Sequence, residues 1–194
     1  MAVGNSQDQP ATAARRGDCI ELVLVGRELP AITLASTDGA VGLDELGRDL
    51  LVLFVYPHAT GLPVAPVPGW DSIPGARGCT AQSCAFRDQR PRLGELGAEL
   101  AGLSVQTLDE QREFAARVGL QYRLIADPEL RLAAMLALPT FSAGNRPFYR
   151  RLALVAENGA IAKVFYPVAE PEQNAADVVA WLESGLREEG PRSR

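Results

Sequence analysis

The chain has 194 residues, of which 47% are hydrophobic and 22% charged, a composition ordinary for a globular protein with one core. At this length a single core buries enough surface to be stable without disulfides or metal ions. The formal net charge of −5 gives no broad basic surface, so we expect neither nucleic acid nor a membrane as a partner.

The two ends of the chain are expected to be tails. Residues 1–18 are small and polar and lack the apolar run of a secretory signal, which predicts a flexible N-terminal tail. We expect the folded domain at 19–187 and a flexible C-terminal tail at 188–194. The most apolar run, Leu50–Tyr56, is too short to cross a bilayer, so a cytoplasmic location is the default expectation.

The first half of the chain predicts short strands followed by a long loop. Residues 19–24 and 31–36 are expected to be strands, the second closed by a Thr-Asp-Gly turn at 37–39. The Val- and Leu-rich run Leu50–Tyr56 is typical of a central strand covered on both faces. Residues 57–78 hold five prolines and four glycines, which excludes regular structure, and so long a loop in a compact domain is usually functional.

From Cys79 onward helices and strands alternate. A helix is expected from Cys79 until Pro91 kinks or ends it. The later expected elements are a strand at 99–105, a helix opened by a capping box of Thr107 and Glu110, a strand at 122–127, a helix at 128–138 started by Asp127 and Pro128, a hairpin turning at Asn158-Gly159, and a C-terminal helix striped by Val178, Val179, Leu182 and Leu186. This order predicts an α/β fold with a mixed central sheet flanked by helices, parallel in its first half and with an antiparallel hairpin at one edge.

Two cysteines stand at the predicted start of the first long helix. Cys79 follows Gly78, so its sulfur would lie in the first helical turn, where unpaired backbone N–H groups favour the nucleophilic thiolate. A zinc site is not expected, because Cys79, Cys84 and the only histidine, His58, would still leave one ligand missing. For Cys84, which neighbours Phe86, an inert buried role stays open.

The spacing of the pair restricts what a disulfide could do. Five residues of α-helix advance about 7.5 Å and hold the two Cα atoms roughly 8.6 Å apart. A disulfide tolerates no more than about 7 Å. Cys79 and Cys84 would therefore bond only if the first helical turns unwind, which suits a redox switch better than a permanent crosslink.

The segment GCTAQSCAFRD at 78–88 resembles the active-site segment of peroxiredoxins, in particular the branch called peroxiredoxin Q or bacterioferritin comigratory protein. The resemblance extends over about 26–187 and includes the stretches VGRELPAITLASTDG, LLVLFVYP and RRLALVAENGAIAKVFYPV. It implies a thioredoxin-like fold and thiol-dependent reduction of hydrogen peroxide or organic hydroperoxides, with no cofactor.

The resemblance also implies roles for individual residues. Cys79 would be the peroxidatic cysteine, oxidised to a sulfenic acid, and Cys84 would resolve it to an intramolecular disulfide. A thioredoxin-like or glutaredoxin-like partner would reduce that disulfide. Counting back nine positions from Gly159 makes Arg150 the family's second functional arginine, with Arg151 the alternative one register away. Its guanidinium would stabilise charge on the leaving oxygen.

The sequence departs from the family before Cys79. The family's hydroxyl three residues earlier is absent, because Ala76 stands there. Thr60, in a Tyr-Pro-x-x-Thr remnant ahead of an insertion at 61–77, is our candidate for the missing hydroxyl, and Ser72 is the alternative. The insertion carries Trp70 and would cover the pocket and select larger hydroperoxides, or serve as a docking face or surface decoration.

The other reactive side chains receive simpler interpretations. We interpret His58 as a solvated loop histidine and Cys19 as structural, while Arg87 either supports the site or pairs with Asp88. Our leading hypothesis is a monomeric thiol peroxidase. Two alternatives are a non-peroxidase redox sensor with the same disulfide switch and a thioredoxin-like disulfide oxidoreductase, although the C-x-x-C motif of the latter is absent.

Overall fold

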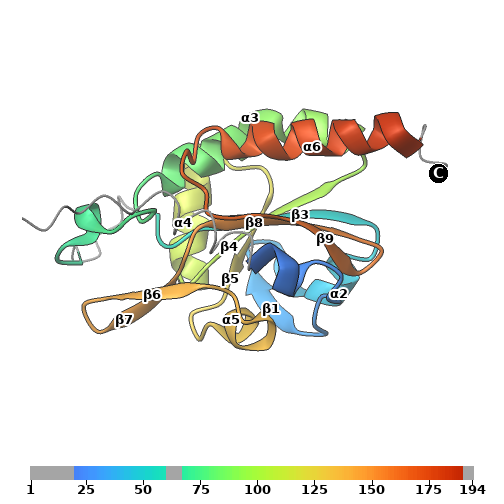
Figure 1. Cartoon of the computed structure of the whole chain (residues 1–194). Helices are drawn as coiled ribbons and strands as arrows, with labels where there is room; N and C mark the ends of the chain where they lie inside the picture. The colour runs from blue at the N-terminus through green and yellow to red at the C-terminus, as the bar shows by residue number, and fades with distance from the viewer. Residues whose placement is uncertain (1–19, 60–66, 190–194) are drawn as a thin grey trace, which may run out of the picture.

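A mixed β-sheet forms the centre of the computed structural model, which describes residues 20–59 and 67–189 (Figure 1). Within those ranges seven strands lie in the order β2-β1-β5-β4-β3-β8-β9. They are β1 (Thr33–Ser36), β2 (Gly39–Gly42), β3 (Leu50–Val55), β4 (Glu99–Ser104), β5 (Arg123–Ala126), β8 (Leu152–Glu157) and β9 (Ala160–Phe165). β4 runs parallel to β3 and β5, and every other pairing is antiparallel. The predicted mixed sheet is confirmed, but antiparallel strands flank its parallel centre on both sides.

Helices cover both faces of this sheet. They are α2 (Leu43–Leu46), α3 (Cys79–Glu95), α4 (Leu108–Val118), α5 (Arg131–Leu136) and α6 (Asn174–Glu189). Side chains of β3 alternate between the faces: Leu51 and Leu53 pack with α2 and α5, whereas Val52 and Phe54 pack with α3, α4 and α6. Figure 1 shows α6 lying along α3 on the second face. None of the helices in the described ranges has the length and apolarity that crossing a membrane demands.

The strand predicted at 19–24 is wrong, because residues 20–24 are helical. Ile20 and Leu24, four positions apart, both pack on the core, whereas Leu22 and Val23 between them are exposed. A strand would have placed Leu22 on the same face as Leu24, so the burial pattern follows the helical period and not the two-residue one.

The prediction for α3 is right at its beginning and wrong at its end. The helix starts at Cys79, as expected, but continues through Pro91 to Glu95. Leu93, two residues after the proline, is fully buried in the core on this face of the sheet. Its packing holds the last turn of α3 against the sheet in spite of the proline.

α5 begins later than the sequence predicts. Leu130 adopts a left-handed φ of 55°, so the helix starts at Arg131 and not at 128. The predicted capping residue is nevertheless confirmed. The buried carboxylate of Asp127 accepts hydrogen bonds from the backbone N–H groups of Arg131 and Leu132, at 3.0 and 2.9 Å.

The two strongest turn signals are confirmed, and one hairpin was not predicted. Thr107 and Glu110 form the reciprocal capping box that opens α4. Asn158 and Gly159 have φ values of 53° and 83°, both positive as a type I′ turn requires. The additional hairpin, β6 (Thr140–Ala143) with β7 (Arg146–Tyr149), pairs separately from the main sheet (Figure 1).

Because β3 pairs with β8, the C-terminal end of β3 lies beside the N-terminal end of β8, and the active-site groups meet there. Val55, the last residue of β3, lies opposite Leu152, the first residue of β8. The loop that leads from β3 to Cys79 therefore begins at the same end of the strands at which Arg151 precedes β8. This register brings residues more than 70 positions apart in the sequence into one site.

Gly102 supplies a test of the packing in the centre of the sheet. A Cβ atom there would lie 2.7 Å from Cζ of Phe54 and 2.8 Å from Cδ2 of Leu124. Phe54 cannot withdraw, because its ring stacks on Phe86 with centroids 4.4 Å apart. We expect Gly102→Ala to lower the free energy of unfolding by about 1–3 kcal/mol, measured by urea denaturation.

The matched control for this change is Gly94→Ala, in α3. A Cβ atom at Gly94 would meet nothing within 4 Å. We expect this control to keep or raise the stability, by up to about 1 kcal/mol, because alanine favours helix. Equal stabilities of the two variants would contradict the close packing of β4 against Phe54.

Candidate active site

Cys79 occupies the first position of α3 and is almost completely buried. Gly78, the residue before the helix, has a left-handed φ of 92°. The Cys79 sulfur lies 3.6 Å from the carbonyl oxygen of Ala76, which accepts from the thiol, and 3.2 Å from Nη2 of Arg151. The predicted placement of Cys79 at a helix start is confirmed, and a guanidinium faces its sulfur.

Arg151, and not Arg150, is the arginine at the sulfur. Its side chain is buried, with 3% of the residue exposed. The guanidinium donates to the carbonyl oxygen of Arg77 at 2.7 Å and to Oε1 of Gln82 at 2.5 Å. Its Nε–H is buried and none of the described residues accepts from it.

Arg150, the arginine predicted from the sequence, therefore does not lie at the sulfur, and Arg151, the residue one register away, does. The Arg150 guanidinium lies 5.6 Å from the ring centroid of Phe141, in the β6–β7 hairpin. Alternation along the chain explains the difference. Alternate residues of a strand share a face, so Arg151 points to the same side as Ala153 and Val155, whose side chains pack on the face that α3 covers.

Cys84 lies on the same intact helix and is half-buried. Both cysteines are unbonded. Tyr122 packs near this part of α3 and donates a hydrogen bond to the carbonyl oxygen of Ser83 at 2.8 Å. Arg87 forms the surface ion pair with Asp88 at 2.9 Å and also donates to the Val118 carbonyl, so it points away from Cys79.

His58 is buried, which contradicts its interpretation as a solvated loop histidine. Only 8% of it is exposed. Its ring packs edge-on against both Trp70 and Phe148, with each centroid 6.1 Å away. Trp70 in turn contacts Phe148, at 5.0 Å, and Phe141, at 5.8 Å. The described part of the insertion, 67–77, is thus packed, through Trp70, onto the β6–β7 hairpin.

Two of these rings, His58 and Trp70, border a cleft that opens on the Cys79 sulfur. The cleft has a volume of about 250 Å³. It is lined by His58, Trp70, Asp71, Ala76, Arg77, Gly78, Cys79 and Thr80. Of the three roles considered for the insertion, forming a wall of the pocket is the one that this lining supports.

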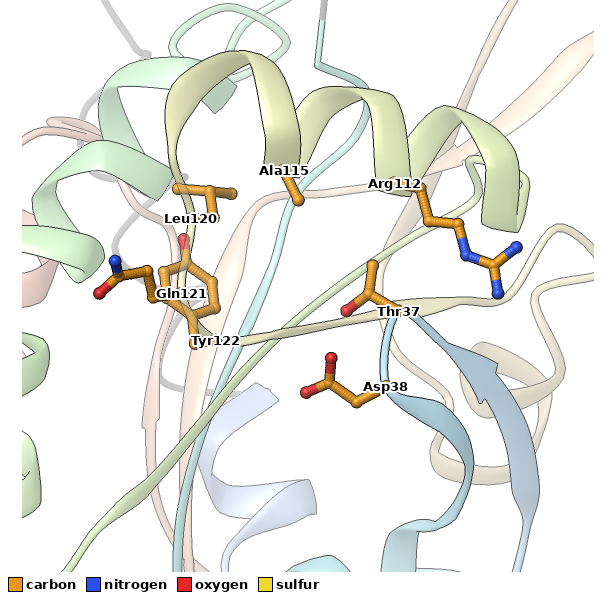
Figure 2. A pocket seen from close by; sticks show the side chains of 7 residues that line it. All are labelled: Thr37, Asp38, Arg112, Ala115, Leu120, Gln121 and Tyr122. Atoms are coloured by element: carbon orange, nitrogen blue, oxygen red, sulfur yellow. The ribbon is translucent and has the colours of Figure 1, made fainter.

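A second cleft, of about 350 Å³, lies between the C-terminal end of α4 and the β1–β2 turn (Figure 2). Its lining residues are Thr37, Asp38, Arg112, Ala115, Leu120, Gln121 and Tyr122. Neither cysteine lines it. The larger cleft therefore has no cysteine among its lining residues, and the smaller one contains the Cys79 sulfur.

The remaining sequence candidates contribute little to the described geometry. Ser72 is exposed in a short 3-10 turn. Thr60 and Cys19 lie outside the described residues, so the proposed hydroxyl of Thr60 stays a prediction. In the part of the chain that the structure describes, no three His, Cys, Asp or Glu side chains gather as a metal site would require.

Sequence reasoning missed the residues that support Arg151. Gln82, three positions after Cys79, is completely buried and accepts from the arginine. Its amide nitrogen donates to Oδ1 of Asn174, the first residue of α6, at 2.8 Å. A polar residue one turn after Cys79 could have identified Gln82 from the sequence as a residue of the site. The contribution of Asn174, by contrast, depends on the tertiary fold.

Known proteins share this arrangement of fold and sequence. The sequence model of the Redoxin family matches residues 24–180. Chloroplastic peroxiredoxin Q of Sedum lineare is 25% identical over 181 residues, which are 93% of this chain and 89% of that one. Peroxiredoxin bcp1 of Schizosaccharomyces pombe is 34% identical over 109 residues, covering 55% of this chain and 48% of its own.

Solved structures of related proteins have a fold similar to that of this chain. Peroxidoxin BcpB of Mycobacterium tuberculosis has a TM-score of 0.68 at 22% identity, covering 83% of this chain and 97% of its own. Peroxiredoxin Q of Xanthomonas campestris has a TM-score of 0.65 at 20% identity, covering 82% and 97%. The chain belongs to the redoxin family of thioredoxin-like folds. Within it, the chain is a thiol peroxidase of the peroxiredoxin Q branch, as the cysteine segment predicted.

The buried state of His58 predicts a pH dependence of stability. Burial lowers the pKa of His58 below its ordinary 6.5, with Glu110 opposing and Arg146 adding to the effect. As the pH falls through about 6.5, the unfolded chain therefore binds a proton before the folded one, and stability is lost. We expect the wild type to lose stability relative to His58→Phe between about pH 7.5 and pH 5, measured by chemical denaturation.

This comparison isolates one group, because His58 is the only histidine in the chain. Phenylalanine keeps an aromatic ring against Trp70 and Phe148 but does not titrate. A stability difference between the two proteins that stays constant over this pH range would show that His58 is solvated after all.

Proposed function

We propose that Cys79 reduces hydrogen peroxide and organic hydroperoxides, with Arg151 stabilising the reacting charges and Cys84 completing the cycle. The observation that carries the proposal is the 3.2 Å contact between Nη2 of Arg151 and the Cys79 sulfur, in a site where both residues are buried. A fixed cation at this distance stabilises the thiolate, which is the nucleophilic form of the side chain.

The first step is attack of the Cys79 thiolate on the terminal oxygen of the peroxide. The S–O bond forms as the O–O bond breaks, so the sulfur is oxidised by two electrons to a sulfenic acid and the peroxide is reduced. The leaving oxygen carries the developing negative charge and takes up a proton to become water or an alcohol. Arg151 faces this charge, and its Nε–H, without an acceptor among the described residues, supports a role as donor to the peroxide.

The second step joins the two cysteines. The Cys84 thiol attacks the sulfenic sulfur of Cys79, the S–S bond forms and water leaves. Because α3 spans both residues, the first turns must open before the sulfurs can meet. A dithiol protein of the thioredoxin or glutaredoxin type then reduces the disulfide by thiol exchange.

Organic hydroperoxides fit the site as well as hydrogen peroxide. The cleft of about 250 Å³ beside the sulfur is larger than hydrogen peroxide needs, and His58 and Trp70 supply apolar ring surface to it. A solved relative, the bacterioferritin comigratory protein of Xanthomonas campestris, is described by its alkyl peroxide reduction activity.

We place the protein in the cytoplasm as a monomer, which is the expectation from its sequence.

The assignment of the arginine is tested by a pair of conservative substitutions. Arg151→Lys keeps a positive charge but loses the planar fork of donors. We expect the second-order rate constant of Cys79 with hydrogen peroxide, measured by stopped flow, to fall about 10²- to 10³-fold. Arg150→Lys is the matched control and should change this constant less than about twofold. The reverse order of effects would restore Arg150 as the functional arginine.

The role of Cys84 is tested by separating oxidation from turnover. In Cys84→Ser the first oxidation should proceed at the wild-type rate, because Arg151 and Cys79 are untouched. Steady-state turnover with a thioredoxin system should be lost, and the Cys79 sulfenic acid should accumulate and react with a dimedone-type probe. Cys79→Ser should abolish both activities. Unchanged turnover of Cys84→Ser would reduce Cys84 to an inert helical residue.

A further inference from the structure

The segment that leads into α6 holds the first turn of α3 at two points. The Pro171 ring lies against Gly78, so closely that a Cβ atom on Gly78 would be 2.7 Å from its Cγ. One turn later, Oδ1 of Asn174 accepts a hydrogen bond from Nε2 of Gln82 at 2.8 Å. Asn174 and Gln82 are 2% and 0% exposed, so this bond is shielded from water.

The second contact also orients a group of the active site. Arg151 can only donate, so Gln82 must turn its amide oxygen toward the guanidinium, as it does at 2.5 Å. The amide nitrogen of Gln82 then needs its own acceptor, and Oδ1 of Asn174 accepts its hydrogen bond. Asn174 is thus a positioning residue, which acts on Arg151 through Gln82.

The far end of α3 is fastened to α6 separately. Arg92 of α3 pairs with Glu183 of α6 at 2.7 Å and with Glu95 of its own helix at 2.7 Å. Opening of the first turn therefore does not require α3 to leave α6 along its whole length. Besides the contact of Cys79 with Arg151, the contacts that must break are those of Gly78 and Gln82.

We propose that Pro171 and Asn174 form a clamp on the first turn of α3 and set the balance between its wound and unwound states. The proposal rests on the proposed function, in which the wound turn presents Cys79 to peroxide and the unwound turn lets Cys84 reach it. Unwinding separates Gly78 from the Pro171 ring and removes both partners of the Gln82 amide. A tighter clamp prolongs the life of the sulfenic acid, and a looser clamp hastens the disulfide.

Asn174→Ala should loosen the clamp in a characteristic way. It leaves Nε2 of Gln82 unpaired in the wound turn, whereas water satisfies that group in the unwound turn. The unwound population, and with it the rate of disulfide formation from the sulfenic acid, should rise about tenfold, the size of effect that loss of one buried hydrogen bond produces. The rate of peroxide attack should fall less than about threefold, because the wound turn stays the major state.

The experiment is a single turnover with one equivalent of hydrogen peroxide, quenched at intervals with a thiol-alkylating reagent and analysed by mass spectrometry. Pro171→Ala, which removes the ring from Gly78, should change the disulfide rate in the same direction but less. Asn174→Asp should restore the wild-type rate, because a carboxylate oxygen still accepts from Gln82. Gln173→Ala, an exposed neighbour in the same segment, is the matched control and should match the wild type.

A second measurement needs no peroxide. In the reduced protein, backbone amide hydrogens of 79–84 should exchange faster in Asn174→Ala and Pro171→Ala than in Gln173→Ala. Unchanged exchange would overturn the clamp, even if the wild type proved unreactive toward peroxide and the proposed function failed. Faster exchange with an unchanged or slower disulfide step would overturn the coupling of the clamp to the reaction. If Asn174→Ala does not fold, Pro171→Ala carries both measurements.

Discussion

A buried guanidinium is the constraint around which the site is built. Only 3% of Arg151 reaches the surface, so the partners of its guanidinium must come from the protein. The carbonyl oxygens of Gly75 and Arg77, Oε1 of Gln82 and the Cys79 sulfur supply them. Among these described partners only the sulfur can become an anion. The curl of the loop before α3 and the position of the Cys79 sulfur therefore both follow from satisfying one buried guanidinium.

The parts of the fold that were predicted from the sequence have local causes. Cys79 opens α3 because a glycine able to adopt a left-handed φ precedes it. The capping box of α4 and the Asn158-Gly159 turn each lie within four consecutive residues, so their geometry needs no distant partner. The central strand β3 was evident because burial on both faces requires an unbroken apolar run.

The features that could not be predicted depend on which face a residue occupies or on distant contacts. β8 is buried on both faces, so no alternation of polar residues shows whether Arg150 or Arg151 points toward α3. His58 is buried by Phe148, 90 positions further along the chain, and by a tryptophan in an insertion. Asn174 gains its role only when α6 lies along α3. Each of these required the tertiary structure.

The contact between Trp70 and the β6–β7 hairpin belongs to a part of the molecule that is distinct from the main sheet and from α3. Cys79 and Arg151 lie at the start of α3 and beside the start of β8, whereas Trp70 lines the cleft from a segment outside the main sheet and packs on a hairpin that is also outside it. Loops and hairpins of this kind accept sequence change without unfolding a core. The side chains at Trp70 and in the hairpin can therefore change together while the backbone carbonyls of Gly75 and Arg77, which hold Arg151, stay in place. Such an exchange would alter the wall of the cleft and leave the groups around Cys79 in position.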